Sequence, residues 1–354
     1  KGSFQLFPPR PTVRFVTNRG FFRQATPGKN YQMSGATIFT KTQEKKADGS
    51  VVEHFLDAGS NPPDGVLVTY SLKEEPKGSV TLTFLDAAGN EIKSFKSEEK
   101  KPEGEDNKTD ADSQKPDAQS SSAKDAPKAP KEPGVNRFIW DMRYADAEGI
   151  DGFFTAEGTL PGPIAAPGTY QVRLTVGDET QTQSFTIEKD PRVQATQADL
   201  DAQFALLCRI RDTINETHAT IKTLRTVRVQ AEEWEKRASG EKVNPAISEH
   251  IATLKERLAP IEEDLIQTQA KVRSDTLNFP VKLNSKLAGV YSAVAGADAV
   301  PTKQSVAVYE SLAGRADAHR ATLNAIVEQD VAALNTMIRD AHIPAIVPRE
   351  SGKG

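Results

Sequence analysis

The chain has 354 residues, of which 37% are hydrophobic and 27% are charged, and its 45 basic and 49 acidic residues leave a net charge of −4. This nearly balanced charge gives no overall basic surface and argues against nucleic-acid binding. The single cysteine excludes an intrachain disulfide framework and a multi-cysteine metal site, and no apolar run reaches the roughly 18 residues of a membrane-spanning helix. The length allows two or three domains, and a start at Lys1 without a signal-peptide pattern predicts a processed chain or a fragment.

The first residues are predicted to form an extended arm followed by a hairpin. Prolines punctuate Phe4–Arg14, and each proline fixes φ and removes a backbone donor, so this stretch is predicted to be an extended connector. Thr37–Lys41 and Val51–Leu56 flank a polar turn. They are therefore predicted to form a hairpin that extends a sheet or covers its edge.

Six short segments after the arm are predicted to be β-strands, because they are rich in β-branched and aromatic residues and mostly alternate apolar with polar positions. They are Val66–Leu72, Ser79–Leu85, Glu91–Phe95, Val135–Met142, Thr169–Val176 and Glu179–Ile187. Turn residues at Asp86–Asn90 and Gly177–Asp178 predict two antiparallel hairpins. Six strands within about 120 residues are typical of a small sandwich of the immunoglobulin or fibronectin type III kind, with Trp140 in its core.

One long segment, residues 97–133, contains no Val, Ile, Leu, Met, Phe, Trp, Tyr or Cys and carries ten acidic and seven basic residues. Without apolar side chains it cannot offset the entropy lost on ordering, so it is predicted to be a disordered, mobile insertion that buries nothing. A tolerated surface loop is the favoured interpretation, because loop-closure entropy rises only slowly with length. A tail that binds a partner is the alternative.

After Asp190-Pro191 the apolar period changes from two to about 3.5, which predicts helices. The predicted helices are Gln197–Arg237, Pro245–Arg273, Lys282–Ala295 and Thr302–His342. The second has an apolar seam from Ile247 to Val272, and Pro260 within it predicts a kink. Because each long helix has one apolar stripe to bury, we expect the helices to pack antiparallel in a bundle of three or four.

No residue pattern in the sequence predicts a catalytic, cofactor-binding or metal site. The five histidines, none of them in an HExxH motif, are His54, His218, His250, His319 and His342. His218 and His319 lie beside the seams of the first and last helices and could meet, but separate histidines, each satisfied by water or a carboxylate, are the favoured interpretation. Cys208 is interpreted as a small core or flanking residue, and Glu262-Glu263-Asp264 as a solvated helix face. The GxSxG, SxxK, GxGxxG and GxxxxGK[ST] motifs are absent.

Several segments of the chain resemble a bacterial family. They are Gly59–Val66, Leu72–Gly78, Phe84–Asn90, Gly134–Arg143 (GVNRFIWDMR), Ala166–Val176 (APGTYQVRLTV), Asp190–Val193, Phe279–Asn284, Lys286–Ala288 and Ile343–Val347. Together they are similar to the region that follows the β-propeller in sortilin-like, BNR (Asp-box) repeat proteins, often labelled glycosyl hydrolases. Phe4–Arg14 is similar to the exit from the last propeller blade. No Asp-box of the form SxDxGxTW occurs in the chain, so no family catalytic residue can be carried over.

The residues and the resemblance together predict a multidomain α+β fold, in which an immunoglobulin- or fibronectin III-like β-sandwich is followed by an antiparallel α-helical bundle. We expect the arm and hairpin over residues 1–58 and the sandwich over 59–190, with the insertion at 97–133. The bundle is expected over 191–347 and a tail over 348–354.

Long amphipathic helices, strand edges and the missing active-site motifs favour a non-catalytic accessory or interaction region, without a cofactor. The resemblance implies an exported bacterial protein that acts outside the cytoplasm, in the periplasm or at the cell surface. Its expected partner is a protein, either its own propeller segment or other subunits of an assembly. One alternative is a wall of a hydrolase site that the propeller completes. The other is a carbohydrate-binding module, and the aromatic residues that would then contact a ligand or interface are Tyr70, Trp140, Phe153 and Phe154.

Overall fold

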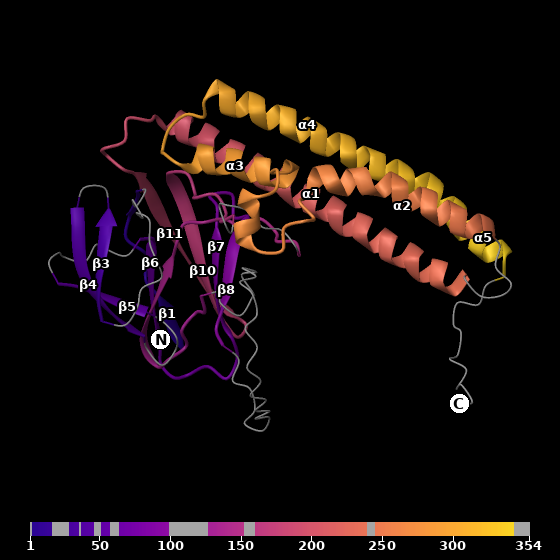
Figure 1. Ribbon diagram of the computed structural model, residues 1–354. Coiled ribbons are helices and arrows are strands. Elements are labelled where there is room, and N and C mark those ends of the chain that lie inside the picture. Colours follow the sequence, from indigo (N-terminus) through magenta and orange to yellow (C-terminus); the bar gives the residue numbers. More distant parts are fainter. Residues whose placement is uncertain are drawn as a thin grey trace.

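The computed structural model describes residues 2–15, 28–34, 37–45, 51–56, 64–98, 127–151, 160–238 and 245–342. It places β-sheets at one end of the molecule and a long helical region at the other (Figure 1). This mixed content agrees with the predicted α+β class. Residues 99–126 of the predicted insertion, Ile343–Val347 and the predicted tail lie outside the described residues.

Two sheets, which we call the β domain, enclose one hydrophobic core. The first sheet, in the order β1-β6-β9, consists of β1 (Phe4–Leu6), β6 (Val66–Leu72) and β9 (Gly134–Trp140). The second, in the order β2-β11-β10-β7-β8, consists of β2 (Thr12–Arg14), β11 (Glu179–Lys189), β10 (Gly168–Val176), β7 (Val80–Leu85) and β8 (Glu91–Lys96). Neighbouring strands are antiparallel except β2 and β11. The six predicted strands are confirmed, with ends that differ by one or two residues.

The core between the two sheets forms because alternate residues of each strand point inward. In β6 the buried positions are Val66, Val68, Tyr70 and Leu72. Trp140 of the first sheet stacks on Phe84 of the second, with ring centroids 4.4 Å apart. Trp140 therefore is a core residue, as predicted.

Both predicted hairpins of the β domain are present. Between β7 and β8, the Asp86 carboxylate accepts hydrogen bonds from the main-chain N–H groups of Ala88 and Asn90, and Gly89 has a φ of 88°. Between β10 and β11, Gly177 has a φ of 60°. Glycine adopts these positive φ values without the steric cost of a Cβ atom, which is why the turns close there.

The arm Phe4–Arg14 is extended, as predicted, but it is more than a connector. Its first residues form β1, which pairs with β6, and its last residues form β2, which pairs with β11. The prolines stand between the two strands, where no ladder hydrogen bond is needed. The arm thus joins both layers of the β domain.

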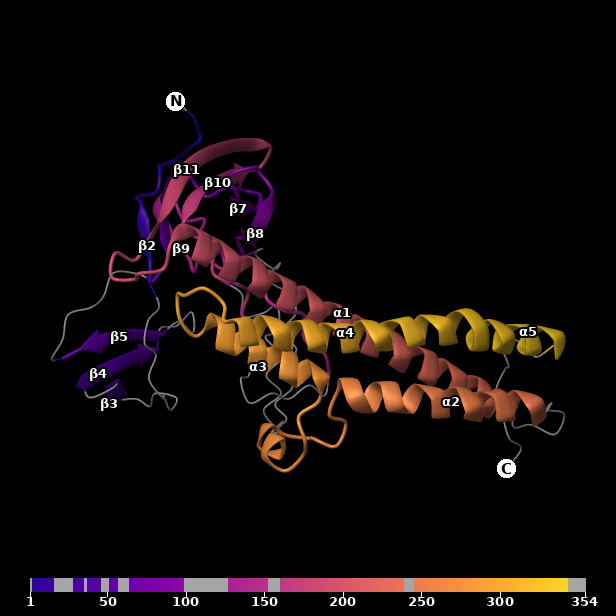
Figure 2. The same ribbon diagram turned by 90° about the horizontal axis from the view of Figure 1, so that it is seen from above.

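A third sheet lies beside the β domain and away from the far end of the helices (Figure 2). Its order is β3-β4-β5, with β3 (Gly28–Ser34), β4 (Thr37–Lys45) and β5 (Val51–Phe55) all antiparallel. The predicted hairpin corresponds to β4 and β5 and is confirmed.

The end of the predicted insertion packs against the β domain. Ala129 is buried in the core, and its N–H donates to the carbonyl of Lys96 in β8. The Tyr70 hydroxyl donates to the carbonyl of Pro130. The prediction that residues 97–133 bury nothing is therefore wrong at this end, because alanine is small enough to fill a core position while the prolines beside it remain near the surface.

The described helical region contains four long helical segments. The first three are α1 (Gln197–Ala238), α2 (Pro245–Leu265) and α3 (Leu283–Ala295). The fourth is continuous and consists of α4 (Lys303–Ile326), a short π-helix (Val327–Val331) and α5 (Ala332–Asp340). The second predicted helix is too long, because α2 ends at Leu265 and Val272 is 38% exposed. Instead, the Asp275 carboxylate accepts from the N–H groups of Lys271 and Val272 and begins a short 3₁₀ turn.

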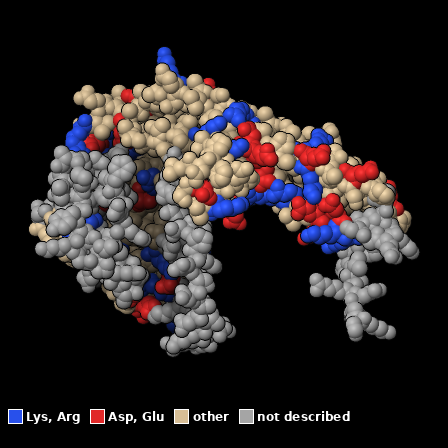
Figure 3. Space-filling view, viewed as in Figure 1, with Lys and Arg blue, Asp and Glu red and all other residues tan. Residues whose placement is uncertain are grey.

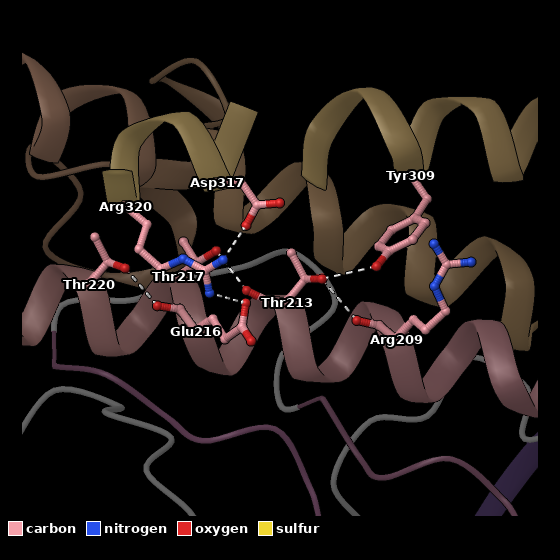
Figure 4. Close-up of polar contacts among 8 residues, drawn as sticks. All are labelled: Arg209, Thr213, Glu216, Thr217, Thr220, Tyr309, Asp317 and Arg320. Atoms are coloured by element: carbon pink, nitrogen blue, oxygen red, sulfur yellow. Dashed lines mark hydrogen bonds and ion pairs between the residues drawn. The ribbon is translucent and has the colours of Figure 1, made fainter. Parts of the chain in front are cut away.

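The two longest helices run in the same direction, whereas the sequence predicts antiparallel packing. Figure 4 shows the seam between α1 and α4, where Thr213 meets Tyr309 and, further along both helices, Glu216 pairs with Arg320. Between the end of α1 and the start of α4, the chain runs back along both helices as α2 and α3, which lie end to end (Figure 2). These two short helices are antiparallel to both long ones, and all four share one apolar core.

A buried ion pair joins the β domain to the helices. The Arg14 guanidinium of β2 lies 2.5 Å from Asp298, which follows α3, and also donates to Gln203 of α1 and to the carbonyl of Ala165. Gln203 in turn donates to the carbonyl of Val294. These bonds fix the start of α1 against the sheets.

Candidate functional site

The aromatic residues proposed from the sequence as ligand contacts do not form a binding surface. Tyr70 and Trp140 are fully buried, and the Trp140 indole N–H donates to the carbonyl of Arg143. Burial raises the pKa of the Tyr70 phenol well above its ordinary value. Phe153 and Phe154 lie outside the described residues. Neither described ring presents a face to a glycan.

The two histidines beside the seams of the first and last helices, His218 and His319, have separate partners. Nδ1 of His218 lies 2.6 Å from the carbonyl oxygen of Glu148, and Nε2 of His319 lies 2.8 Å from a carboxylate oxygen of Asp264. Within the described part of the chain, no three His, Cys, Asp or Glu side chains come close enough to hold a metal ion. Burial raises the pKa of the Cys208 thiol, which is the opposite of the change that activates a cysteine nucleophile.

The helix face predicted to be solvated holds a buried carboxylate. Glu262 of α2 is buried between Arg225 and Arg228 of α1, beside a cavity of about 620 Å³. Although burial raises the pKa of Glu262, hydrogen bonds from both arginines lower it overall. The prediction for Glu262 is therefore wrong, because its partners lie on another helix. The cluster of one carboxylate and two guanidinium groups carries a net charge of +1 and joins α1 to α2.

The outer face of the first sheet exposes three apolar side chains among polar ones, which are Gln5, Thr69, Ser71 and Arg137. The outward positions Leu67, Val135 and Ile139 are 37%, 68% and 46% exposed, and Leu67 lies opposite Ile139 in the β6–β9 ladder. Phe7 and Val13 of the arm are also exposed and line a cavity of about 420 Å³ together with Leu67. We call Phe7, Val13, Leu67, Val135 and Ile139 the apolar face.

The outer face of the second sheet is polar across its central strands. The outward positions there are Thr81, Thr83, Gln171, Arg173, Thr175, Thr182 and Ser184, whereas Leu85 is buried and Val13, opposite Glu188 at the β2 edge, is exposed. Single exposed apolar residues are ordinary on protein surfaces, whereas a contiguous apolar patch marks an interaction site. The contrast between the two sheets therefore singles out the apolar face.

Two basic residues lie beside the apolar face, and one acidic residue, Glu188, lies opposite Val13 in the β2–β11 ladder. Arg10 lines the cavity under Phe7, and Arg137 stands between Val135 and Ile139 on β9. Neither arginine forms an ion pair with an acidic residue in the described ranges. An acidic side chain, Asp141, comes only after β9 has ended. The surface suits a partner that offers apolar side chains and carboxylates.

The sequence contains a signal for the apolar face that was not used when these segments were interpreted as alternating strands. In β6 the run Val66-Leu67-Val68 is apolar at three successive positions, as is Phe138-Ile139-Trp140 in β9. Because side chains of a strand alternate between its two faces, such a run must place an apolar residue outward. Strict alternation would have left those positions polar.

Comparison with known proteins adds no relative: no family model and no curated protein matches the chain. None of the helices in the described part of the chain combines the length and the apolar character needed to cross a lipid bilayer. Charged side chains of both signs are interspersed along the helical region on the side shown in Figure 3. Many of them pair between helices, as Arg315 does with Asp264 and Arg257 with Asp330.

Proposed function

We propose that this chain is a non-catalytic docking region that binds a protein partner through the apolar face. The observation that carries the proposal is that the outer side of the first sheet exposes Leu67, Val135 and Ile139, whereas the central strands of the second sheet present polar side chains. Burying apolar surface is the dominant favourable term in protein association. An interaction surface therefore accounts for side chains that a solvated sheet would not present to water.

The resemblance to the post-propeller region of sortilin-like, BNR repeat proteins supports a specific setting for this docking. In that setting the two sheets are an immunoglobulin- or fibronectin III-like sandwich, the protein is exported by a bacterium, and the partner is a propeller segment or another subunit of an extracytoplasmic assembly. The arm that carries Phe7 and Val13 joins the apolar face directly. A propeller that precedes the arm would lie next to that face.

Site-specific crosslinking in the native host tests the docking. A photoreactive residue in place of Leu67 or Ile139 is expected to give one discrete crosslinked protein, whereas the same residue in place of Thr182, on the polar outer face, gives none. Equal crosslinking from both faces would contradict the proposal. So would turnover of glycoside or peptide substrates by the purified chain that a single substitution abolishes.

A further inference from the structure

The main chain of β9 is open along one side. In β6 the carbonyl of Thr69 accepts from the N–H of Phe7, and the N–H of Lys73 donates to the carbonyl of Ser3, so its odd-numbered residues bond toward β1. Its even-numbered residues therefore bond toward β9, because the N–H and C=O groups of an antiparallel strand alternate between its two neighbours. Val66 and Val68, for example, are opposite Trp140 and Phe138.

Three residues of β9 consequently direct their N–H and C=O groups away from the sheet. They are Val135, Arg137 and Ile139. No strand in the described ranges pairs with this side of β9, and none of the three residues has a main-chain hydrogen bond to another described residue outside the ladder. An edge strand with unpaired donors and acceptors is a template for a further strand.

The opposite edge of the same sheet is closed. The outward N–H of Leu6 donates to the side-chain oxygen of Gln181 at 2.8 Å, and the Gln181 amide donates back to the carbonyl of Phe4 at 3.1 Å. A glutamine of β11 thus occupies the main-chain groups of β1 that a new strand would need. No side chain in the described ranges does this for β9.

The exposed edge of the second sheet is protected in other ways. The ladder between β7 and β8 has a register shift at Phe84 and Leu85, and two lysines, Lys93 and Lys96, stand on the six-residue β8. The carbonyl of Lys96 already accepts from Ala129. Bulges and lysines are common protections against edge pairing. β9 has seven residues and a single charge, Arg137.

A cavity runs beside the open edge. It has a volume of about 450 Å³, and its walls include Ile139 and Arg137 on one side and Pro127 and Pro130 on the other. A proline has no N–H and cannot donate to β9, so this wall leaves the edge unpaired. The volume falls within the range of ligand-binding clefts.

We propose that an extended segment of the partner adds to β9 as a further strand of the first sheet. Its main chain pairs with Val135, Arg137 and Ile139, and its outward side chains alternate between apolar residues over Val135 and Ile139 and a carboxylate against Arg137. This mode of recognition draws affinity from main-chain hydrogen bonds and specificity from alternate side chains. The inference rests on the proposed docking function and gives its partner a chemistry, an apolar and acidic extended peptide.

Amide hydrogen exchange, measured by NMR on the whole chain, tests this pairing with two synthetic peptides. One has the pattern Val-Thr-Glu-Thr-Val, which puts valine, glutamate and valine on one face of the strand, and the other has lysine in place of the glutamate. The valine–glutamate peptide is expected to slow exchange at Val135, Arg137 and Ile139 selectively, because the amides between them are already bonded to β6. The lysine peptide is expected to bind at least about tenfold more weakly, since its one ammonium group meets Arg137.

A proline substitution isolates the contribution of the main chain. Arg137→Pro removes an outward N–H that the sheet does not use, and prolines are tolerated at such edge positions. It is expected to weaken binding of the valine–glutamate peptide about tenfold or more relative to Arg137→Ala, which keeps the N–H and loses the charge. Thermal unfolding of both variants establishes that they are folded, and Val135→Pro with Val135→Thr as its control provides a second pair.

The outcomes separate this inference from the docking proposal. Equal peptide affinity for Arg137→Pro and Arg137→Ala, or protection at residues elsewhere in the chain, would overturn strand addition while leaving crosslinks from Leu67 unaffected. Equal binding of both peptides would overturn the acidic chemistry of the partner. A dimer of the chain that Arg137→Pro dissociates would show that the added strand comes from a second copy and would overturn the assignment to a partner protein.

Discussion

Gly65, directly before β6, lies closer to Trp140 than any side chain permits. Its φ is 146°, and a Cβ atom placed there would be 2.2 Å from the carbonyl oxygen of Trp140. Gly65→Ala is therefore expected to lower the free energy of unfolding by about 2 kcal/mol or more. Gly78 has no atom within 4 Å of such a Cβ, so Gly78→Ala should change stability by no more than about 0.5 kcal/mol. Chemical denaturation of the two variants measures the difference, and equal stabilities would contradict this account.

His218 makes the stability of the helical region depend on pH. Burial lowers its pKa, helped by the charges of Lys222 and Arg225 and opposed by Glu148. Since the folded chain then binds fewer protons than the unfolded chain, the stability contributed by neutral His218 is complete above the ordinary histidine pKa of about 6.5. It is lost as the pH falls through the lowered pKa of the folded state.

Denaturation between about pH 7.5 and pH 5.5 measures this dependence. His218→Gln, which cannot take up a proton, is expected to lose less stability over this interval than the unmodified chain. His342→Gln, a change at an exposed histidine, should leave the pH dependence as it is. Identical profiles for His218→Gln and the unmodified chain would rule out His218 as the source.

Among the helices, Glu262 connects α2 to α1, and its removal leaves two guanidinium groups without their carboxylate. Arg225 and Arg228 are 27% and 34% exposed, so water compensates part of that loss. Glu262→Ala is therefore expected to cost about 1–3 kcal/mol, below the 3–5 kcal/mol typical of a fully buried pair. Glu263→Ala, next to it on the exposed side, should cost about 0.5 kcal/mol or less. Helical ellipticity followed against denaturant compares the two variants.

The strands could be predicted from the sequence because their signals are local. Alternation in β6 and the Asp86–Asn90 turn lie within a few residues of each other, and they need no distant partner. Burial of Glu262 could not be predicted in this way, since the two arginines that stabilise it are 37 and 34 residues away. The parallel course of α1 and α4 could not be predicted either, because it depends on a long-range arrangement in which α2 and α3 lie end to end.

The candidate surface likewise combines a feature that the local sequence predicts with one that depends on a distant residue. The runs Val66-Leu67-Val68 and Phe138-Ile139-Trp140 carry a local signal that an apolar residue points outward. That the sheet is open at β9 and closed at β1 depends on Gln181, which bonds to β1 from a position 175 residues beyond Leu6. No pattern within β9 distinguishes an edge strand from a central one.

Over the whole molecule, Arg14 couples the unfolding of the β domain to that of the helices. Its guanidinium and the Asp298 carboxylate are each 5% exposed, so removing one leaves the other charged and buried. Arg14→Met is expected to cost about 3–5 kcal/mol, and the double variant with Asp298→Leu should cost less than the sum of the two single changes. Fluorescence of Trp140, measured in a Trp234→Phe background because Trp234 lies in α1, and the ellipticity of the helices report on the two parts separately. We expect their denaturation curves to coincide in the unmodified chain and to separate in Arg14→Met, because the buried pair connects β2 to the chain that follows α3. Coincident curves in that variant would mean that other contacts, such as the ring contact between Tyr144 and Phe204, suffice to couple the two parts.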